Sequence, residues 1–399
     1  MISKVVVIGR NYSSRLGMIR AAGSIGCSVK VVVCVRKLKP CMERPIDCYS
    51  KFVSSYYFAT EPDHQSVINV LIEKCKDELD QQVLLPTDDF AASSIDLYQD
   101  LLSKYYKFPH IQHRQGAIVE MMDKKIQKEI ACSVGLNVVK SWVLSLQNGE
   151  YLLPKDLSYP CFPKPMISFL GDKTCMKRCD NEYELRSVLE TIPRQIQCPI
   201  IVEEYHAIDK EYAILGFCDA NNVIIPTAIE MLIDGTGPHK GVTLQGRILS
   251  NYSDEDLMSK LSSFIKRIKL TGLFDIDTFE SNGKLYFNEL NLRYGASGYA
   301  LTRVGINLPS LLIISLSGKQ QYSAGNIDSD YVFFNEKVAF EDYRNGFISK
   351  DQYNKIMSAS DFSFLRLEND MEPYNVFMHR NFGILKRAKR YLKKCLKLK

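Results

Sequence analysis

The sequence predicts an α/β protein in which an N-terminal doubly wound unit precedes a mixed α+β region with its own central sheet. Two near-continuous apolar runs, residues 4–8 and 29–35, have the pattern of buried parallel strands. A helix-compatible stretch from Ser13 to Gly26 connects them, and a further strand at residues 83–85 precedes another helix. This alternation predicts a doubly wound domain over residues 1–115.

A different pattern begins after this unit, and we place the second region at residues 116–330. An amphipathic helix over residues 123–135 comes first, and short strands then dominate. A capping-box-like start at Ser253 opens another helix, which runs to about Leu270. Residues 331–383 are aromatic and charged, and they predict a small appended layer.

The composition is that of an ordinary globular chain. Of 399 residues, 46% are hydrophobic and 24% are charged, which excludes collagen, coiled coil and disorder as the main architecture. No apolar run approaches the roughly 18–20 residues that span a bilayer, and Arg10 interrupts the N-terminal run too early for a signal peptide. Twelve cysteines without a CxxC pair indicate reduced thiols. We therefore expect a cytoplasmic protein.

The turn after the first strand does not match a dinucleotide-binding fingerprint. Its sequence is Gly9-Arg10-Asn11-Tyr12-Ser13-Ser14, and the next glycine is Gly17. The GxGxxG pattern is absent, so we do not expect NAD or FAD.

A hairpin near residue 280 carries the strongest chemical signal. Its second strand contains Glu289 and Asn291, and Arg293 follows, so that the three alternate and project from one face. Mg²⁺ binds few protein carboxylates and completes its shell with phosphate and water. Two oxygen ligands beside a cation therefore suit Mg²⁺ bound together with phosphates.

The turn of this hairpin decides whether Asp277 belongs to the same site. A two-residue Asn-Gly turn would pair Asp277 with Asn288 and put Glu289 on the opposite face. A three-residue loop with Gly283 in the left-handed conformation pairs Asp277 with Phe287, which makes Glu289 a same-face diagonal neighbour. We predict the three-residue loop. A two-residue turn would remove Asp277 from the metal site.

Several charged residues upstream stand in an order that suits nucleotide binding. Lysines on two separate elements can hold phosphates as point charges. A strand end followed by a bend can offer backbone groups to an adenine edge, and an acid can bind ribose hydroxyls. The residues are, in chain order, Lys124, Lys164, Glu203, Glu204 and Glu211.

This ordered set resembles the ATP-grasp superfamily and, within it, the carboxylate–amine ligases, similar to D-aspartate ligase and to carbamoyl-phosphate-synthetase-like ligases. The resemblance covers roughly residues 1–320. It implies a pre-ATP-grasp domain at the N-terminus, then an ATP-grasp domain with a central sheet and a small lid at about residues 138–205. The most specific element is Glu289-x-Asn291-x-Arg293, followed by Gly295 and Gly298.

The resemblance also implies cofactors and site residues. The cofactors are ATP and Mg²⁺, with two ions expected and Mn²⁺ as a substitute. The implied nucleotide residues are Lys124, Lys164, Glu203, Glu204, Tyr205, Ala207 and Glu211, and the implied metal ligands are Asp277, Glu289 and Asn291. The lid loop departs from the family, because residues 166–173 contain one glycine where several are usual. Phe169 and Leu170 either disturb its closure or cover the phosphates.

The implied reaction is ATP-dependent acyl phosphate formation followed by attack of an amine, with release of ADP and phosphate. Arg293 is the candidate that stabilises the transferring phosphoryl group or holds the carboxylate. Lys240 or Arg247 would contact the acyl phosphate. His239 either accepts the amine proton or is an exposed loop histidine.

The substrates of such ligases contact the N-terminal domain. Arg10 and Arg15 follow its first strand, and either could bind a second carboxylate or lie in solvent. The expected partners are a small carboxylate and a small amine. The sequence leaves the oligomeric state open, and a homodimer is compatible with it.

Residues 384–399 form a cationic tail. They contain eight Lys+Arg and no acid, and Leu385, Ala388, Leu392 and Leu396 recur at helical spacing. The tail therefore predicts either an interfacial helix on an anionic membrane, at its inner face, or a docked or solvated helix. Nucleic acid is not expected, because only Tyr391 is interleaved among the cations. The formal net charge of +5 depends on this segment.

Three functions remain open at this point. The first is a ligase of cell-envelope or surface-polysaccharide biosynthesis, and the second is a ligase of small-metabolite biosynthesis, acting on nucleotide or amino-acid precursors. The third is a non-catalytic nucleotide-binding membrane adaptor. The retained Asp277, Glu289 and Asn291 set argues against the third.

Overall fold

The computed structural model describes residues 4–147, 150–167, 175–192, 199–252, 254–318 and 324–382. The first unit is a five-stranded parallel sheet in the order β3-β2-β1-β4-β5. Its strands are β1 (Lys4–Gly9), β2 (Ser28–Val35), β3 (Val53–Thr60), β4 (Gln82–Pro86) and β5 (Tyr106–Lys107). The predicted parallel sheet is confirmed.

Helices cover both faces of this sheet. The side chains of β1 alternate, so that Val5 and Val7 pack with helix α1 while Val6 and Ile8 pack on the opposite side. Burial on both faces explains why the strand is an unbroken apolar run. The helices of this unit are α1 (Tyr12–Gly23), α2 (His64–Val70), α3 (Asp89–Leu97) and α4 (Gln99–Leu102).

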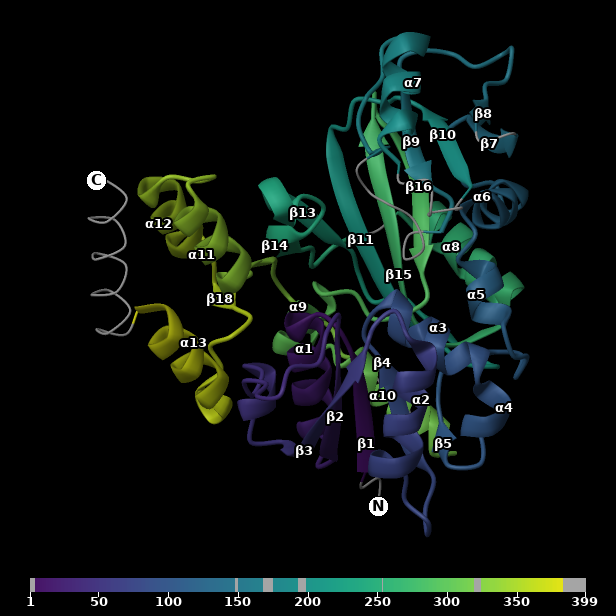
Figure 1. Ribbon diagram of the computed structural model, residues 1–399. Helices are drawn as coiled ribbons and strands as arrows, with labels where there is room; N and C mark the ends of the chain where they lie inside the picture. Colours follow the sequence, from purple (N-terminus) through teal and green to yellow (C-terminus); the bar gives the residue numbers. More distant parts are fainter. Residues whose placement is uncertain are drawn as a thin grey trace.

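The second unit has two sheets (Figure 1). A four-stranded antiparallel sheet of order β8-β7-β10-β9 packs with helix α7, and we call this unit the lid, after the prediction. A larger sheet runs in the order β16-β15-β11-β13-β14-β17-β18, with β12 beside β11 and β6 beside β15. The lid elements are β7 (Ser141–Gln147), β8 (Glu150–Leu152), β9 (Cys161–Pro165), α7 (Glu182–Glu190) and β10 (Ile200–Glu204).

The large sheet lies between two groups of helices. One face packs against α5, α6 and α8, and the other packs against α1, α9 and α10, so both units share a core. The strands are β6 (His110–Ile111), β11 (Lys210–Cys218), β12 (Val223–Ile224), β13 (Ile229–Asp234), β14 (Thr243–Ile248), β15 (Leu270–Ser281), β16 (Lys284–Asn291), β17 (Tyr331–Phe334) and β18 (Phe362–Ser363). The helices are α5 (Ala117–Met121), α6 (Lys124–Ser133), α8 (Glu255–Ile268), α9 (Gly298–Arg303) and α10 (Leu308–Leu316).

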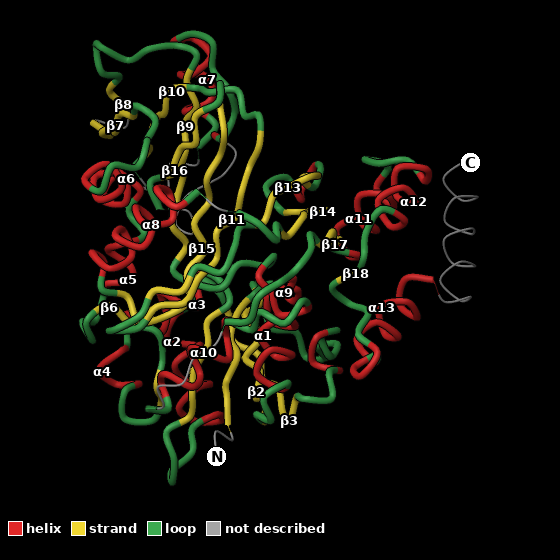
Figure 2. Tube along the Cα trace, turned by 180° about the vertical axis from the view of Figure 1, so that it is seen from behind, coloured by secondary structure: helices red, strands yellow, loops and turns green. Residues whose placement is uncertain are grey.

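The C-terminal segment adds to the large sheet and then extends beyond it. Its strands β17 and β18 continue the sheet, while α11 (Glu336–Asn345), α12 (Lys350–Ser358) and α13 (Glu372–Phe382) lie to one side (Figures 1 and 2). Buried Arg20 of α1 ties this segment to the first unit, because its Nε donates to Asp370 Oδ2 at 2.8 Å.

Residues 384–399 lie outside the described residues. None of the described helices is long and apolar enough to cross a bilayer.

Candidate active site

The β15–β16 hairpin closes with a two-residue turn. Ser281 pairs with Lys284, so Asn282 and Gly283 alone form the turn, with φ values of 52° and 70°. Both residues favour this left-handed region, and a turn of this kind follows the twist of its strands. The predicted three-residue loop is therefore wrong.

A β-bulge nevertheless keeps Asp277 beside Glu289. Thr278 pairs with Phe287, whereas Asp277 pairs directly with Glu289, which leaves Asn288 as the extra residue. A bulge shifts the register by one residue, and directly opposed residues share a face. The expectation that a two-residue turn would remove Asp277 from this face is therefore also wrong.

Helix α6 places a lysine against the same face of the hairpin. Lys124 is the first residue of α6, where the Asp123 side chain caps the helix by accepting the backbone N–H of Lys125. Lys124 Nζ lies 3.0 Å from Glu289 Oε2, and Asn291 Nδ2 donates to Asp277 Oδ2 at 3.0 Å. The structure thus brings Lys124 together with all three predicted metal ligands.

The buried amide of Gln127 fixes α6 against β16. Its Nε2 donates to the Leu290 carbonyl at 2.9 Å, and its Oε1 accepts the Leu290 N–H at 2.8 Å. Leu290 follows Glu289 directly, so this pair of hydrogen bonds holds the helix and the strand in one register. The alignment of Lys124 with Glu289 follows from it.

The lid contributes a second lysine. Lys164 of β9 lies 2.7 Å from Glu203 Oε2 and donates to Asn288 Oδ1 at 2.8 Å. Lys128 Nζ lies 2.8 Å from the other oxygen of Glu203. Burial would raise the pKa of Glu203, but the two lysines hold it below its ordinary value. The bulge residue is therefore a contact between lid and hairpin.

Lys128 was not predicted as a site residue. It lies one helical turn after Lys124, at the i,i+4 spacing that places two side chains on the same face of a helix. That spacing is the sequence feature from which Lys128 could have been predicted as a site residue. Burial lowers the pKa of Lys128, and Glu203 opposes this effect.

The predicted adenine-binding segment connects β10 to β11. The Glu204 N–H donates to the Lys140 carbonyl and the Tyr205 N–H donates to the Pro160 carbonyl, both at 2.9 Å. These two amides are used within the lid, so an adenine ring would have to contact other backbone groups here. Ala207 is exposed at the end of the segment.

Glu211 lies at the start of β11 and is half-buried. Burial raises its pKa, Asp234 raises it further, and Lys164 opposes both effects. The ladder pairs Glu211 with Phe279 and Ala213 with Asp277, so Glu211 shares the face of Asp277. The structure thus brings Glu211 to the same side of the sheet as the hairpin carboxylates.

Two neighbouring carboxyl groups in the hairpin have raised pKa values. Burial raises the pKa of Asp275 to about 6, and the charge of Glu289 adds to the rise while Arg293 opposes it. Burial likewise raises the pKa of Asp277 well above its ordinary value, with Asp275 and Glu289 adding to the effect. Asp275 Oδ1 is buried and has no hydrogen-bond partner among the described residues.

Glu289 behaves in the opposite way. Burial would raise its pKa, but Lys124, Lys164 and Arg293 lower it to about 2. Glu289 therefore favours its ionised form, whereas the pKa of Asp277 is raised. The two carboxyl groups differ because Lys124 lies 3.0 Å from Glu289 Oε2 and Lys164 adds a second positive charge.

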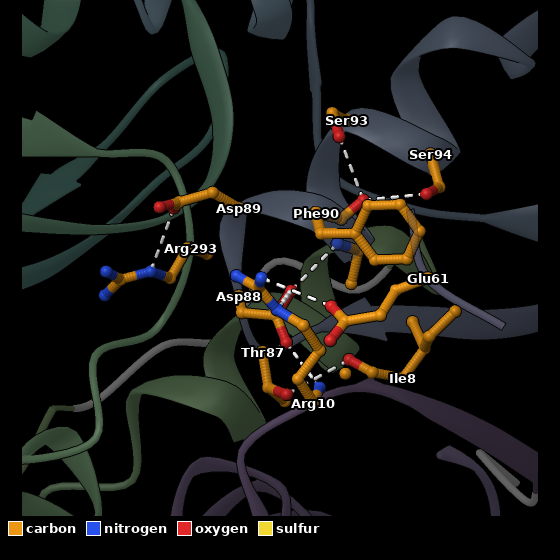
Figure 3. A network of polar contacts seen from close by, with 12 residues as sticks. Ile8, Arg10, Glu61, Thr87, Asp88, Asp89, Phe90, Ser93, Ser94 and Arg293 are labelled. Carbon is orange, nitrogen blue, oxygen red and sulfur yellow. Dashed lines mark hydrogen bonds and ion pairs between the residues drawn. The ribbon is translucent and has the colours of Figure 1, made fainter. Parts of the chain in front are cut away.

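Arg293 joins the hairpin to the first unit. Its Nε lies 3.1 Å from Asp89 Oδ1 at the start of α3, as Figure 3 shows, and its Nη2 donates to Asn291 Oδ1 at 3.1 Å. Its Nη1 lies 3.4 Å from Asp275 Oδ2. A Cβ at Gly295 would lie 1.9 Å from that same oxygen, so the glycine permits this close approach. Asp89 and Asp275 were not predicted as site residues.

The two arginines after β1 are already paired. Arg15 is fully buried, and its guanidinium donates to both oxygens of Asp47 at 2.7 and 2.9 Å, so the interpretation that it binds a substrate carboxylate is wrong. Arg10 lies 3.3 Å from Glu61 and 3.4 Å from Asp88 (Figure 3). The carboxyl edge of the first sheet is therefore rich in acids.

The structure does not bring Arg247 to the cluster. Arg247 pairs across the sheet with Glu230, at 3.6 Å between their charged atoms, and Glu230 pairs with Tyr212. Tyr212 in turn pairs with Thr278, which alternates with Asp277. Arg247 therefore lies on the face opposite Asp277, and its predicted contact with an acyl phosphate is wrong.

The loop before β14 is anchored to the C-terminal segment. His239 Nδ1 lies 2.6 Å from buried Asp342, and its Nε2 lies 3.1 Å from Glu341, so both ring nitrogens face carboxylates of α11. These contacts give His239 a structural role. They replace the predicted role in which His239 accepts the proton of the amine substrate. Lys240 is exposed, and its charge opposes the rise that burial causes in the pKa of Asp234.

The donor set fits magnesium better than a transition metal. It consists of two carboxylates and one amide, and no described group of three His, Cys, Asp or Glu side chains is arranged to hold an ion. Magnesium commonly takes one or two carboxylates together with phosphate oxygens. The unpartnered Asp275 oxygen and the convergent acids indicate that a cation would be stabilised here.

Sequence comparison identifies relatives over about half of the chain. The chain is 26% identical over 215 residues to the carbamoyl phosphate synthase large chain of Lachnoclostridium phytofermentans, covering 53% of this chain and 18% of the relative. It is 27% identical over 196 residues to the D-alanine–D-alanine ligase of Bacillus velezensis, covering 45% and 54%. The chain thus spans well under two thirds of these relatives. No protein-family model matches it.

Structural comparison covers more of the chain. The Campylobacter jejuni biotin carboxylase has a TM-score of 0.64 at 15% identity, covering 83% of this chain and 75% of that one. The Staphylococcus aureus N5-carboxyaminoimidazole synthetase, complexed with ADP, has a TM-score of 0.61 at 18% identity, covering 86% and 85%. The biotin carboxylase domain dimer of Hydrogenobacter thermophilus 2-oxoglutarate carboxylase, which holds MgADP, has a TM-score of 0.60 at 17% identity, covering 82% and 73%. These likenesses confirm the predicted fold class.

Proposed function

We propose that this chain, which resembles the ATP-grasp carboxylate–amine ligases in sequence and fold, is an ATP-dependent ligase of that type. It would convert a carboxylate to an acyl phosphate, transfer the acyl group to an amine, and release ADP and phosphate. One observation carries the proposal: Lys124 of α6, Lys164 of β9 and the Asp277–Glu289–Asn291 set of the β15–β16 hairpin converge. The chemistry needs such a set, because phosphoryl transfer depends on positioning and on charge stabilisation.

Without nucleotide, the cations and carboxylates neutralise one another. Lys124 is held by Glu289 and Lys164 is held by Glu203. Phosphate oxygens would compete with these carboxylates for the lysines, because a lysine ammonium group is a compact point charge that suits phosphate. Asp277, Glu289 and Asn291 would then hold Mg²⁺, which supplies neutralisation of the phosphate charge. The number of ions and the substitution by Mn²⁺ remain predictions from the sequence.

Arg293 is suited to the reacting end of the nucleotide. Three acceptors from Asp89, Asp275 and Asn291 hold its guanidinium in one orientation. A fixed planar fork of donors matches a carboxylate or a phosphoryl group. We assign Arg293 to the substrate carboxylate or to the transferring phosphoryl group, and Glu211 to the ribose.

The charges at the boundary of the two units favour an amine over a second carboxylate. Glu61, Asp88 and Asp89 lie at the carboxyl edge of the first sheet, and Arg10 is already ion-paired with the first two. An added anion would meet this acidic edge, whereas an ammonium group would be stabilised by it. This inference replaces the predicted binding of a second carboxylate by Arg10.

The substrates define the most informative assay. The relatives include a D-alanine–D-alanine ligase, which makes amino acids the first carboxylates to test. They also include carbamoyl phosphate synthase large chains, which favour small-metabolite biosynthesis. The membrane contact of residues 384–399 and the homodimer stay predictions from the sequence.

We expect hydroxylamine to trap the acyl phosphate as a hydroxamate when the protein, MgATP and the correct carboxylate are combined. ADP should appear in step with the hydroxamate, and omission of the carboxylate should abolish both. A panel of amino acids and uronic acids would be screened. Bound ATP without hydroxamate or ADP across the panel would support the non-catalytic adaptor instead.

Magnesium affinity is expected to rise with pH. Burial raises the pKa of the unliganded Asp277 carboxyl, so a metal ion competes with a proton there, whereas Glu289, with a pKa of about 2, is already ionised. Calorimetric titration of MgADP between pH 5 and 8 in buffers of different ionisation enthalpy should therefore show proton release. The Asp277→Asn variant should bind MgADP more weakly, and its affinity should depend less on pH. Equal affinity across this range without proton release would contradict the assignment.

A further inference from the structure

A large groove lies away from the proposed active site, between the first unit and the large sheet. Its volume is about 1210 Å³. Its walls come from α4, β5 and β6, from the β11–β12 connection, and from the ends of α8 and α10. Figure 2 shows α4 and β6 on the flank away from α11–α13. The proposed reaction uses none of the side chains that line it.

The groove contains most of the unusual backbone in the described chain. Four described residues other than glycine have positive φ, and three of them line the groove: Gln112 at 52°, His113 at 53° and Lys269 at 59°. Such conformations persist where the surroundings hold them, and they cluster at functional sites. The fourth residue, Asn282, is explained by the hairpin turn, and Lys269 is the left-handed C-cap of α8.

A buried acceptor without a partner lies in the wall of this groove. Gln99 lines the groove with 4% of its surface exposed, and its Oε1 has no hydrogen-bond partner among the described residues. Beside it in the lining, His110 accepts the His113 N–H through Nδ1 at 3.2 Å, and the two rings stack 3.5 Å apart. A buried acceptor is normally satisfied, so Gln99 is suited to an N–H or O–H of a bound molecule.

The charges of the groove favour an anion. Lys107 of β5 and Lys266 and Lys269 at the end of α8 line it, and none of the three forms an ion pair with another described residue. Of the two acids in the lining, Asp219 already accepts the backbone N–H groups of Asn221 and Asn222. Lysines from two separate elements therefore face the groove without carboxylate partners.

We propose that this groove is a second ligand site, for a small anionic molecule whose phosphate or carboxylate group contacts Lys107, Lys266 and Lys269. A hydroxyl or N–H of the same molecule would donate to Gln99. The site is separate from the catalytic cluster: Thr271 lines the groove, and Asp275 follows four residues later on the same strand, about 13 Å away at ~3.3 Å per residue. Occupancy would therefore restrain the start of the strand that carries Asp275 and Asp277.

The test uses the full-length protein without ATP. Inorganic phosphate, pyrophosphate and citrate are titrated calorimetrically into the wild type, the double variant Lys107→Gln/Lys266→Gln, and the control Arg267→Gln. Arg267 has the same charge, lies next to Lys266 on α8 and does not line the groove. Saturable binding is expected in the wild type and the control, and affinity should fall by at least about tenfold in the double variant.

A further arm separates this site from the nucleotide site. Lys164→Met should bind the same probe as tightly as the wild type, because Lys164 belongs to the other site. No saturable binding of any probe, equal binding by the double variant, or loss of binding in Lys164→Met would overturn the proposal. Gln99→Met provides a second check in a protein whose lysines are intact. This variant should bind citrate more weakly, because citrate has a hydroxyl group that can donate to Gln99.

Discussion

Replacing Glu289 with Gln is expected to slow carboxylate-dependent ADP release by more than about 100-fold. Mutation of a residue that only hydrogen-bonds to a metal ligand already lowers metal affinity or activity by about 10–100-fold, and Glu289 is proposed as a ligand itself. Glu289 is ionised in the unliganded protein, because Lys124, Lys164 and Arg293 lower its pKa to about 2, whereas the pKa values of Asp275 and Asp277 are raised. The amide keeps an acceptor for Lys124 Nζ, now 3.0 Å from Glu289 Oε2, but removes the charge that a metal ion needs. A coupled assay for ADP, at saturating MgATP, measures the effect.

Glu280→Gln is a matched control in the same hairpin. Glu280 accepts from the Tyr212 hydroxyl at 3.2 Å, and an amide oxygen can replace it. We expect this variant to turn over like the wild type. Circular dichroism and urea unfolding establish that both variants are folded. Turnover by Glu289→Gln within a few-fold of the wild type would rule out its assignment as a metal ligand.

Replacing Glu203 with Leu is expected to cost about 3–5 kcal/mol of unfolding free energy, because it leaves buried charge without a partner. Glu203 lies between Lys128 and Lys164, at 2.8 and 2.7 Å, and all three side chains are shielded from solvent. Burial already lowers the pKa of Lys128, and Glu203 is what opposes that effect. The change should appear as a lower urea midpoint at pH 7.

The neighbouring residue provides the control for this second variant. Glu204 is exposed, and Glu204→Leu should change stability by no more than about 0.5 kcal/mol. Adding Lys128→Met to Glu203→Leu should recover part of the loss, since one of the two unpaired cations is removed. A loss below about 1 kcal/mol for Glu203→Leu would mean that the lysines find other partners, and it would contradict the role of Glu203 as their shared counter-ion.

Much of this site follows from residue order alone. Lys124 and Lys164 stand in two different elements, and the alternation of Glu289, Asn291 and Arg293 places three side chains on one strand face. Strand alternation and helix capping are local properties, so they can be recognised without knowing the tertiary contacts. The order of strands and helices in the first unit is predictable for the same reason.

The rest depends on contacts between distant segments. The Asn282-Gly283 dipeptide indicates a two-residue turn, but nothing local indicates a bulge at Asn288, and the face of Asp277 depends on both. Arg247 has the charge expected at a phosphate site, yet its pairing with Glu230 puts it on the other face of the sheet. Arg15 has the right position after the first strand, but Asp47, far along the chain, holds its guanidinium.

The bulge at Asn288 has a consequence for the length of the hairpin. Loss of one residue between the turn and Glu289 would remove the bulge and leave Glu289 opposite Asp277 in a regular ladder, because directly opposed residues share a face. Gain of one residue there would instead exchange the two faces of the strand's end. Leu290, which now packs in the core beneath the sheet, would then point toward the lysines, and the carboxylate would enter an apolar layer. An alignment of distant relatives should therefore be anchored at Glu289, and a one-residue gap on its turn side is compatible with the same site.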